Sequence, residues 1–165
     1  MIEQQRRVDA RAEVRAQIGI DESMIDRLVR EFYRRVKEDP LLGPVFSARI
    51  SDWEPHLQKM HEFWSSVVLM TGRYHGQPME KHMLLPVDAR HFDRWIMLFT
   101  KTSRSICPPV AAQHFNERAR RIAQSLELNI AGQQGVTLKK GERFRRSDRA
   151  VLLPGNATRE TESIS

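Results

Sequence analysis

The sequence predicts a single all-α domain over about residues 21–130. Two observations carry this prediction: apolar residues recur at helical spacing in four segments, and no segment alternates as a half-buried strand would. The chain has 165 residues, which suits one domain with one hydrophobic core. The two ends, residues 1–20 and 131–165, lack sustained apolar periodicity. We therefore expect a helical body between two polar extensions.

The first predicted helix covers residues 22–38. Asp21 is placed to cap its start, and Pro40 helps to end it. Its apolar residues follow the i, i+3, i+4, i+7 and i+11 spacing of a single buried stripe, namely Ile25, Leu28, Val29, Phe32 and Val36.

The second predicted helix covers residues 54–70, with Ser51 or Asp52 as its cap and Gly72 beyond its end. Pro55 is compatible with the first turn of a helix. The wide apolar face of this segment consists of Trp53, Leu57, Met60, Phe63, Trp64, Val67 and Val68.

Two further helices are predicted after an irregular segment. Residues 89–106 follow a possible cap at Asp88, and the fourth helix runs from Pro109 to about residue 130. Between the second and third helices, glycine and proline interrupt the pattern and leave room for one helical turn over residues 79–84.

Composition and charge exclude several classes of protein. Half of the net charge of +6 lies in residues 131–165, which carry seven Lys/Arg and four Asp/Glu, so the nearly balanced body lacks the strong basic face of a nucleic-acid binder. We expect this basic tail to be largely disordered. No apolar run is long enough to span a membrane, and the polar start shows no secretory signal. The single cysteine, Cys107, fits a reducing, cytoplasmic setting.

Common catalytic motifs are also missing from the sequence. It contains no HExxH or CxxC motif, no glycine-rich phosphate loop and no nucleophile elbow. His56 and His61 are five residues apart, about 140° around a helix, and therefore do not easily share a metal. A lone cysteine without a defined base is more often inert than nucleophilic.

Three polar side chains fall at or beside the inner faces of predicted helices. His56 lies on the apolar stripe of the second helix, Tyr33 lies beside that of the first, and Trp95 lies on that of the third. Taken one at a time, each can be explained as a core residue whose polar atom has a hydrogen-bond partner. Together, three buried polar groups are costly unless something bonds to them, and a bound polar ligand would do so. His82, on its own, fits a half-exposed histidine on a turn.

In order and spacing, these residues resemble the bacterial truncated haemoglobins of group III, within the globin superfamily. The similarity covers about residues 20–130. Its most specific part is Tyr74-x-Gly76-x-Pro78 followed by His82, and the Gly-Gly helix breaks of the other truncated groups are missing. The other matching positions are Phe32-Tyr33, Leu42 to Phe46, Trp53, His56, Phe63-Trp64, Leu85-Pro86, Phe92 and Trp95.

The resemblance implies a truncated globin fold, a two-over-two helical sandwich around haem b. It implies that His82 binds the iron, as a neutral imidazole does in globins. The expected ligand-stabilising residues on the opposite face are Tyr33, His56 and Trp95. The expected cofactor contacts are Phe46, Met60 and Phe63 on the walls, with Tyr74, His75 and Lys81 as candidates for the haem propionates.

Three hydrogen-bond donors beside a diatomic ligand imply tight binding or redox chemistry rather than O₂ transport. The resembling family therefore points to O₂, nitric oxide or peroxide as ligands, with peroxidase-like or nitric oxide dioxygenase-like activity. Such activity needs an external reductase, because the sequence contains no flavin or NAD domain. One alternative is a haem-free helical module that docks through its basic C-terminal tail. Another is a haem sensor whose tail reports the ligation state.

Overall fold

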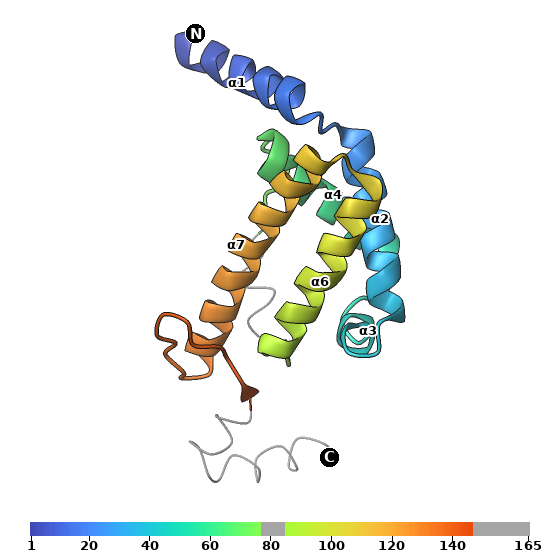
Figure 1. Ribbon diagram of the computed structural model, residues 1–165, viewed down its shortest axis with the longest axis vertical. Helices are drawn as coiled ribbons and strands as arrows, with labels where there is room; N and C mark the ends of the chain where they lie inside the picture. Colours follow the sequence, from blue (N-terminus) through green and yellow to red (C-terminus); the bar gives the residue numbers. More distant parts are fainter. Residues whose placement is uncertain (77–84, 147–165) are drawn as a thin grey trace.

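The computed structural model describes residues 1–76 and 85–146, with the side chains of residues 11 and 14–16 outside that description. Within these residues the chain is helical and contains no strand (Figure 1). The helices are α1 (Ile2–Ile18), α2 (Glu22–Glu38), α3 (Leu42–Ser47), α4 (Trp53–Leu69), α6 (Ala89–Ile106) and α7 (Pro109–Gln133). All four predicted helices are present, and α7 extends three residues beyond its predicted end.

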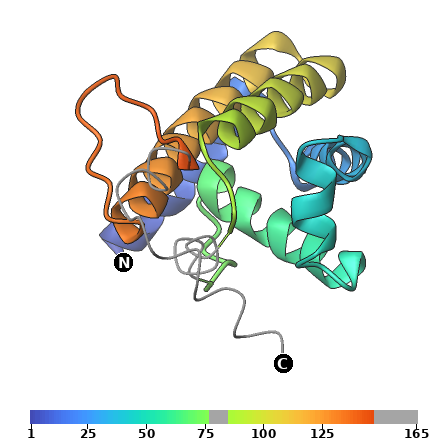
Figure 2. The ribbon, with the colours of Figure 1, turned by 90° about the horizontal axis from the view of Figure 1, so that it is seen from below.

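The helices form two layers. α6 and α7 lie side by side in one layer, and α2 and α4 form the other, with α2 against α6 and α4 against α7 (Figure 2). The short helix α3 contacts both α2 and α6. This arrangement confirms the prediction of an all-α, two-over-two sandwich.

Side-chain caps fix the starts of two of these helices. Asp21 accepts a hydrogen bond from the Met24 N–H at 2.8 Å, and Asp88 accepts one from the Arg90 N–H at 3.0 Å. His91 completes a capping box by accepting from the Asp88 N–H. Asp52 stands at the cap position of α4, but its side chain makes no capping bond. The two capping predictions for α2 and α6 are therefore confirmed in detail.

The turn between α2 and α3 is held by a buried carboxylate. The side chain of Asp39 is 2 % exposed and accepts hydrogen bonds from the N–H groups of Leu41 and Leu42 and from Arg94 Nε, the last at 2.6 Å. Burial alone would raise the pKa of Asp39, but these hydrogen bonds outweigh it and lower the pKa. Gly43 is required here, since a Cβ would lie 2.6 Å from the Lys37 carbonyl oxygen.

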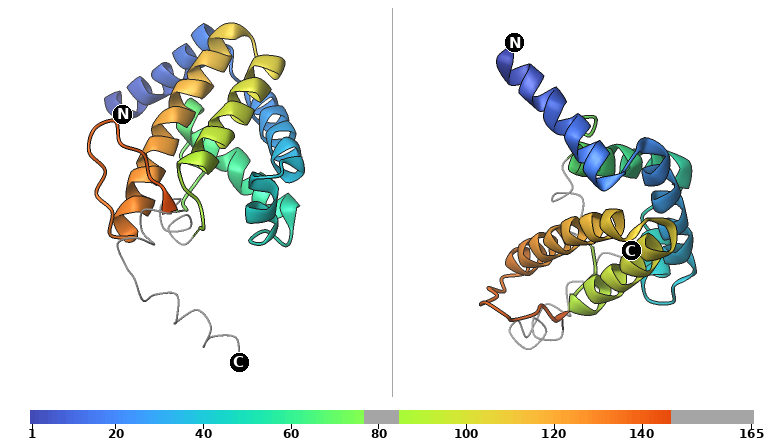
Figure 3. Two further views of the ribbon diagram at one scale, coloured as in Figure 1. Left: turned by 60° about the horizontal axis from the view of Figure 1, so that its bottom comes forward. Right: turned by 45° about the horizontal axis from the view of Figure 1, so that its top comes forward.

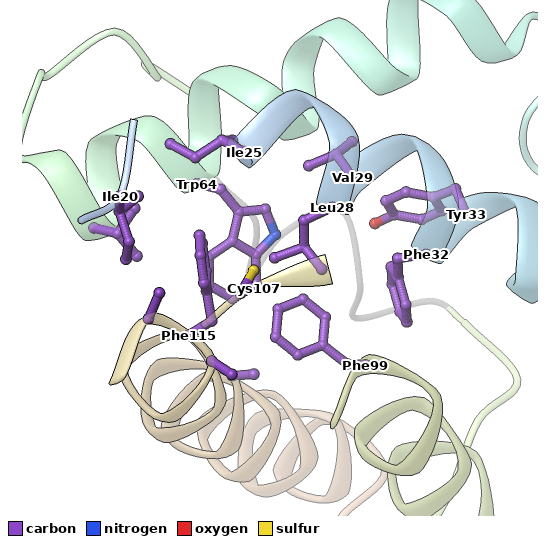
Figure 4. Close-up of a cluster of buried hydrophobic side chains, with 14 of the residues drawn as sticks. Ile20, Ile25, Leu28, Val29, Phe32, Tyr33, Trp64, Phe99, Cys107 and Phe115 are labelled. Carbon is purple, nitrogen blue, oxygen red and sulfur yellow. The ribbon is translucent and has the colours of Figure 1, made fainter. Parts of the chain in front are cut away.

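An aromatic core joins the two layers (Figure 4). Trp64 of α4 stacks on Phe99 of α6 with ring centroids 5.0 Å apart, and Trp95 stacks on the same phenylalanine at 5.5 Å. Cys107 belongs to this core, where burial raises the pKa of its thiol to about 11. The cysteine is thus a packed, unreactive side chain.

The two ends of the chain differ in how closely they pack. α1 projects away from the sandwich and packs against α4 and α7 near its end (Figure 3). Residues 134–146, in contrast, return across the start of α6 and bury Phe144 completely. Residues 134–146 are thus packed within a tail that was expected to be largely disordered, because one buried aromatic and a few ion pairs leave no periodic pattern. Residues 147–165 and the predicted turn over residues 79–84 lie outside the described residues.

None of the helices in the described part of the chain combines the length and the apolar composition needed to cross a membrane.

Candidate functional site

A cavity of about 530 Å³ lies between the two layers, within the usual size range of cofactor pockets. Side chains from α2, α3, α4, α6 and α7 line it, together with Leu85 and Val87 before α6. Its apolar walls include Leu42, Val45, Phe46, Ile50, Met60, Phe63, Trp64, Phe92, Ile122 and Leu126. Both layers of the fold therefore contribute apolar walls to the cavity, which suits it to a large apolar ligand.

The three predicted ligand-stabilising residues all line this cavity. Tyr33 is 5 % exposed, and its ring meets the edge of the His56 ring at 5.0 Å and 88°. Trp95 reaches the cavity from α6 and packs edge-on against Phe32, the neighbour of Tyr33, at 5.5 Å. Residues from three helices, distant in sequence, are thus brought to one cavity.

Two of these polar groups have no protein partner in the described part of the chain. The hydroxyl of Tyr33 and the indole N–H of Trp95 make no hydrogen bond to another described residue. Burial raises the pKa of Tyr33, so its hydroxyl keeps its proton at neutral pH. Because buried polar groups normally find partners, these donors favour a bound ligand that accepts hydrogen bonds.

The predicted wall residues Phe46, Met60 and Phe63 line the cavity. Tyr74 lines it as well, with its ring edge-on to Phe63 at 5.3 Å and its N–H donating to Ser66 Oγ. The Tyr74 ring folds over Gly76, where a Cβ would clash with it. A side chain at position 76 would therefore require the Tyr74 ring to move.

Of the remaining predicted contacts, the structure describes only His75. His75 is exposed and does not line the cavity. Lys81 and His82 lie outside the described residues, between Gly76 and Leu85. The structure thus leaves the proposed iron ligand untested, although Tyr74 and Leu85 on either side of that segment both line the cavity.

Some lining residues were missed by sequence reasoning. Lys59 lines the cavity and was not selected, although it lies three residues after His56 and so shares a face of α4. Arg49 and Val45 also line it, but they belong to or follow α3, a helix too short to give a periodic pattern. His91 lines it while its ring nitrogen caps α6.

A second cavity, of about 650 Å³, lies between α6, α7 and residues 138–143. Charged side chains make up much of its lining, among them Arg120, Lys139, Lys140, Asp93 and Glu127. It is therefore less suited to a large apolar cofactor than the cavity between the layers. Within residues 1–76 and 85–146, no three His, Cys, Asp or Glu side chains converge on a metal position.

A helical sandwich that encloses an aromatic-walled cavity is the architecture of the globin class of proteins. The family model of bacterial-like globins matches residues 14–127. The chain is 31 % identical over 113 residues to the group 3 truncated hemoglobin ctb of Campylobacter jejuni, covering 66 % of this chain and 89 % of that protein. The chain belongs to the bacterial-like globin family, and within it to the group III truncated haemoglobins.

Solved structures agree with this assignment. The crystal structure of group III truncated hemoglobin from Campylobacter jejuni matches with a TM-score of 0.62 at 30 % identity, over 74 % of this chain and 95 % of that one. The hemoglobin of Chloroflexus aurantiacus matches with a TM-score of 0.57 at 24 % identity, over 68 % and 95 % of the two chains, and supports the fold alone. The predicted family is confirmed, and the globin family implies a haem cofactor.

Proposed function

We propose that this globin holds haem b in the cavity between its layers, with His82 on the iron, and binds O₂ or another diatomic ligand on the opposite face. The observation that carries the proposal is a pair of hydrogen-bond donors, on the buried Tyr33 and the partly buried Trp95, that line the cavity without a partner among the described residues. Haem iron, when bound, supplies reversible ligand binding and electron transfer.

The walls of the cavity would retain the cofactor and exclude water. Phe46, Met60 and Phe63 present apolar surface to it from α3 and α4, and Phe92 does so from α6. Burial of such surface is favourable by about 25 cal/mol per Å². An apolar macrocycle therefore fits these walls, whereas a small polar metabolite would leave most of them unused.

The assignment of His82 rests on the family pattern and on chain connectivity. Tyr74 and Leu85 both line the cavity, so described residues on either side of positions 77–84 lie at its wall. His82 is the histidine of that segment. A neutral imidazole on one face of the iron leaves the other face open, as ligand binding requires.

On the open face, Tyr33, His56 and Trp95 would donate hydrogen bonds to a ligand that gains negative charge. Tyr33 keeps its proton because burial raises its pKa. Hydrogen bonds to a charged partner contribute roughly 1.5–3 kcal/mol each, so two of them slow ligand escape by a factor on the order of 100 or more. We therefore infer tight binding, or redox chemistry on O₂, nitric oxide or peroxide, rather than O₂ transport.

The haem propionates require donors at the mouth of the cavity. Tyr74 and Lys59 line it and can supply a hydroxyl and an ammonium group. His75 is exposed and outside the lining, which removes structural support for its predicted role. We therefore propose Lys59 with Tyr74 as propionate contacts in addition to the predicted Lys81.

A peroxidase-like or nitric oxide dioxygenase-like cycle on this site needs an external reductase. The alternative of a haem-free module that docks through its basic tail is weakened by two contacts. Arg143 and Arg146 of that tail bind residues of the helical body, and so are not free to meet an acidic partner.

Titration of the apoprotein with hemin tests the proposal. We expect one haem per chain with an intense Soret band, and a large loss of haem affinity in His82→Ala. His75→Ala is the matched control, because His75 is exposed and does not line the cavity. No Soret band in the wild type, or equal haem binding by His82→Ala and His75→Ala, contradicts the proposal.

A further inference from the structure

The family match ends at residue 127, but the ordered chain continues well beyond it. After α7, residues 134–146 turn back along the molecule, and we name them the C-terminal strap. Gly135 and Gly141 have positive φ angles of 77° and 86°, which let the chain reverse twice. The strap ends against the start of α6 (Figure 3).

Phe144 anchors the strap in an apolar cluster of its own. Its side chain is 0 % exposed and packs with Val87, Ile130 and Ala131. The partly buried members of this cluster are Val45, Leu85, Phe92, Val136 and Leu138. Four members of the cluster also line the cavity between the layers: Val45, Leu85, Val87 and Phe92. The strap therefore stands directly behind one wall of the proposed haem pocket.

Hydrogen bonds tie the strap to the same wall. The Phe144 carbonyl accepts from the Ala89 N–H at 2.8 Å, at the first residue of α6. Arg146 donates from Nε to the Val87 carbonyl at 3.0 Å and from its terminal nitrogen to the Leu85 carbonyl. One guanidinium group thus bonds to the carbonyls of Leu85 and Val87, and its planar fork of N–H donors suits it to bind two acceptors at once.

An ion-pair bridge holds the middle of the strap. Arg143 binds Glu127 of α7 at 2.9 Å and Asp93 of α6 at 2.7 Å. The side chain of Glu127 is largely buried, so this pair is partly shielded from solvent. The bridge joins the strap to both helices of one layer, and leaves Phe144 and Arg146 to act on the loop before α6.

We propose that Arg146 is a positioning residue for the haem pocket, acting through the carbonyls of Leu85 and Val87. Together with Phe144, it fixes Leu85 and Val87, which line the cavity just before α6 begins. Leu85 lies three residues after His82, the proposed iron ligand, in the sequence. The inference rests on the proposed function only for its effect on haem. The hold on the loop is a property of the apoprotein as well.

The test compares Arg146→Ala with Arg145→Ala in the full chain. Arg145 is the adjacent arginine, is exposed and has the same charge, so its removal controls for charge and for the site of mutation. In the apoprotein, amide hydrogen exchange at Ala89 reports on the strap directly, since that N–H bonds to Phe144. We expect exchange at least about tenfold faster in Arg146→Ala, and unchanged in Arg145→Ala, with α2 and α4 protected as in the wild type.

In the holoprotein, two readouts follow the pocket. Transfer of haem to an excess of a haem-scavenging protein should be about tenfold faster in Arg146→Ala, which corresponds to about 1.4 kcal/mol. The iron–histidine stretching band of the ferrous protein should shift in this variant alone. Arg146→Lys should restore only part of both effects, because an ammonium group cannot bond to two separated carbonyls as a guanidinium does.

The outcomes separate the two hypotheses. If the wild type gives no Soret band, the proposed function fails, and the exchange rates still decide whether the strap holds the loop. If Arg146→Ala and Arg145→Ala exchange alike at Ala89, the positioning role is overturned. It is also overturned if Arg146→Ala speeds exchange equally in α2 and α4, since that result indicates general destabilisation.

Discussion

Replacement of Tyr33 by Phe separates the stability of the fold from the function of the site. The substitution removes one hydroxyl and keeps the ring, whose edge-on contacts with Phe32 and His56 have centroid distances of 5.0 Å each. The hydroxyl makes no hydrogen bond to another described residue. We therefore expect the free energy of unfolding of the apoprotein to change by less than about 1 kcal/mol.

Ligand release should respond much more strongly. The hydrogen bond that the Tyr33 hydroxyl would donate to a charged ligand contributes roughly 1.5–3 kcal/mol, so its loss should speed O₂ release by about 10- to 150-fold. The rate is measured by stopped-flow displacement of O₂ from the ferrous protein with excess carbon monoxide. Tyr74→Phe is the matched control, because Tyr74 is the only other tyrosine and lines the same cavity.

Two results would refute this reasoning. Equal O₂ release from Tyr33→Phe and the wild type would show that the hydroxyl does not reach the ligand. A loss of several kcal/mol in unfolding free energy would show that the hydroxyl serves the fold. In Tyr74→Phe we expect O₂ release to stay within about twofold of the wild type, since its hydroxyl is assigned to the propionates.

Three further predictions follow from buried or lining groups. Asp39→Ala should lower the free energy of unfolding by about 2–3 kcal/mol, because it strands Arg94 and two backbone N–H groups. The pKa of Asp39 is lowered in the folded protein, so its contribution to stability is present above the unfolded pKa of about 3.9 and is lost as the pH falls through the folded pKa. In urea titrations, the difference in unfolding free energy between Asp39→Ala and the wild type should therefore shrink below about pH 4. A difference that stays constant with pH would contradict the assignment. Cys107 should react with a thiol reagent at pH 8 only after unfolding, because burial raises its pKa to about 11, and rapid labelling of the native protein would be inconsistent with that burial. Lys59→Ala should speed haem transfer by up to about fivefold while His75→Ala leaves it unchanged, and the reverse order would move the propionates to the His75 side.

The four long helices of the body could be predicted because each carries its own pattern. The stripe of α2 from Ile25 to Val36 is a local signal, and so are the caps at Asp21 and Asp88. Such signals depend on residues within a few turns of one another, so a single sequence contains them in full. The boundaries of α2 and α6 were accordingly predicted to the residue.

Features that depend on distant partners could not be predicted in this way. The burial of Phe144 follows from contacts with Val87 and Ile130, far away in sequence, and no periodicity marks it. Helix α3 has six residues, fewer than two turns, and its place is fixed by the Asp39 carboxylate and by the absence of a Cβ at Gly43. Both features are products of the tertiary structure.

The candidate site could be predicted from the sequence only in part. His56 was visible on the stripe of its helix, but nothing in one sequence shows that Tyr33 and Trp95 share a cavity with it. The order and spacing of the group III truncated haemoglobins supplied that link. Lys59 was within reach of the helical spacing from His56 and was overlooked because an exposed lysine is unremarkable in a helix.

An experimental structure of the haem-loaded protein would test the proposed position of haem between the two helical layers. We expect the porphyrin in the cavity between the two layers, the iron bonded to His82, and Tyr33 and His56 on the opposite face. Iron bonded to His56 or Tyr33 would reverse the two faces of the site. Haem bound in the charged cavity between α6, α7 and the C-terminal strap, or no bound haem, would overturn the proposed function.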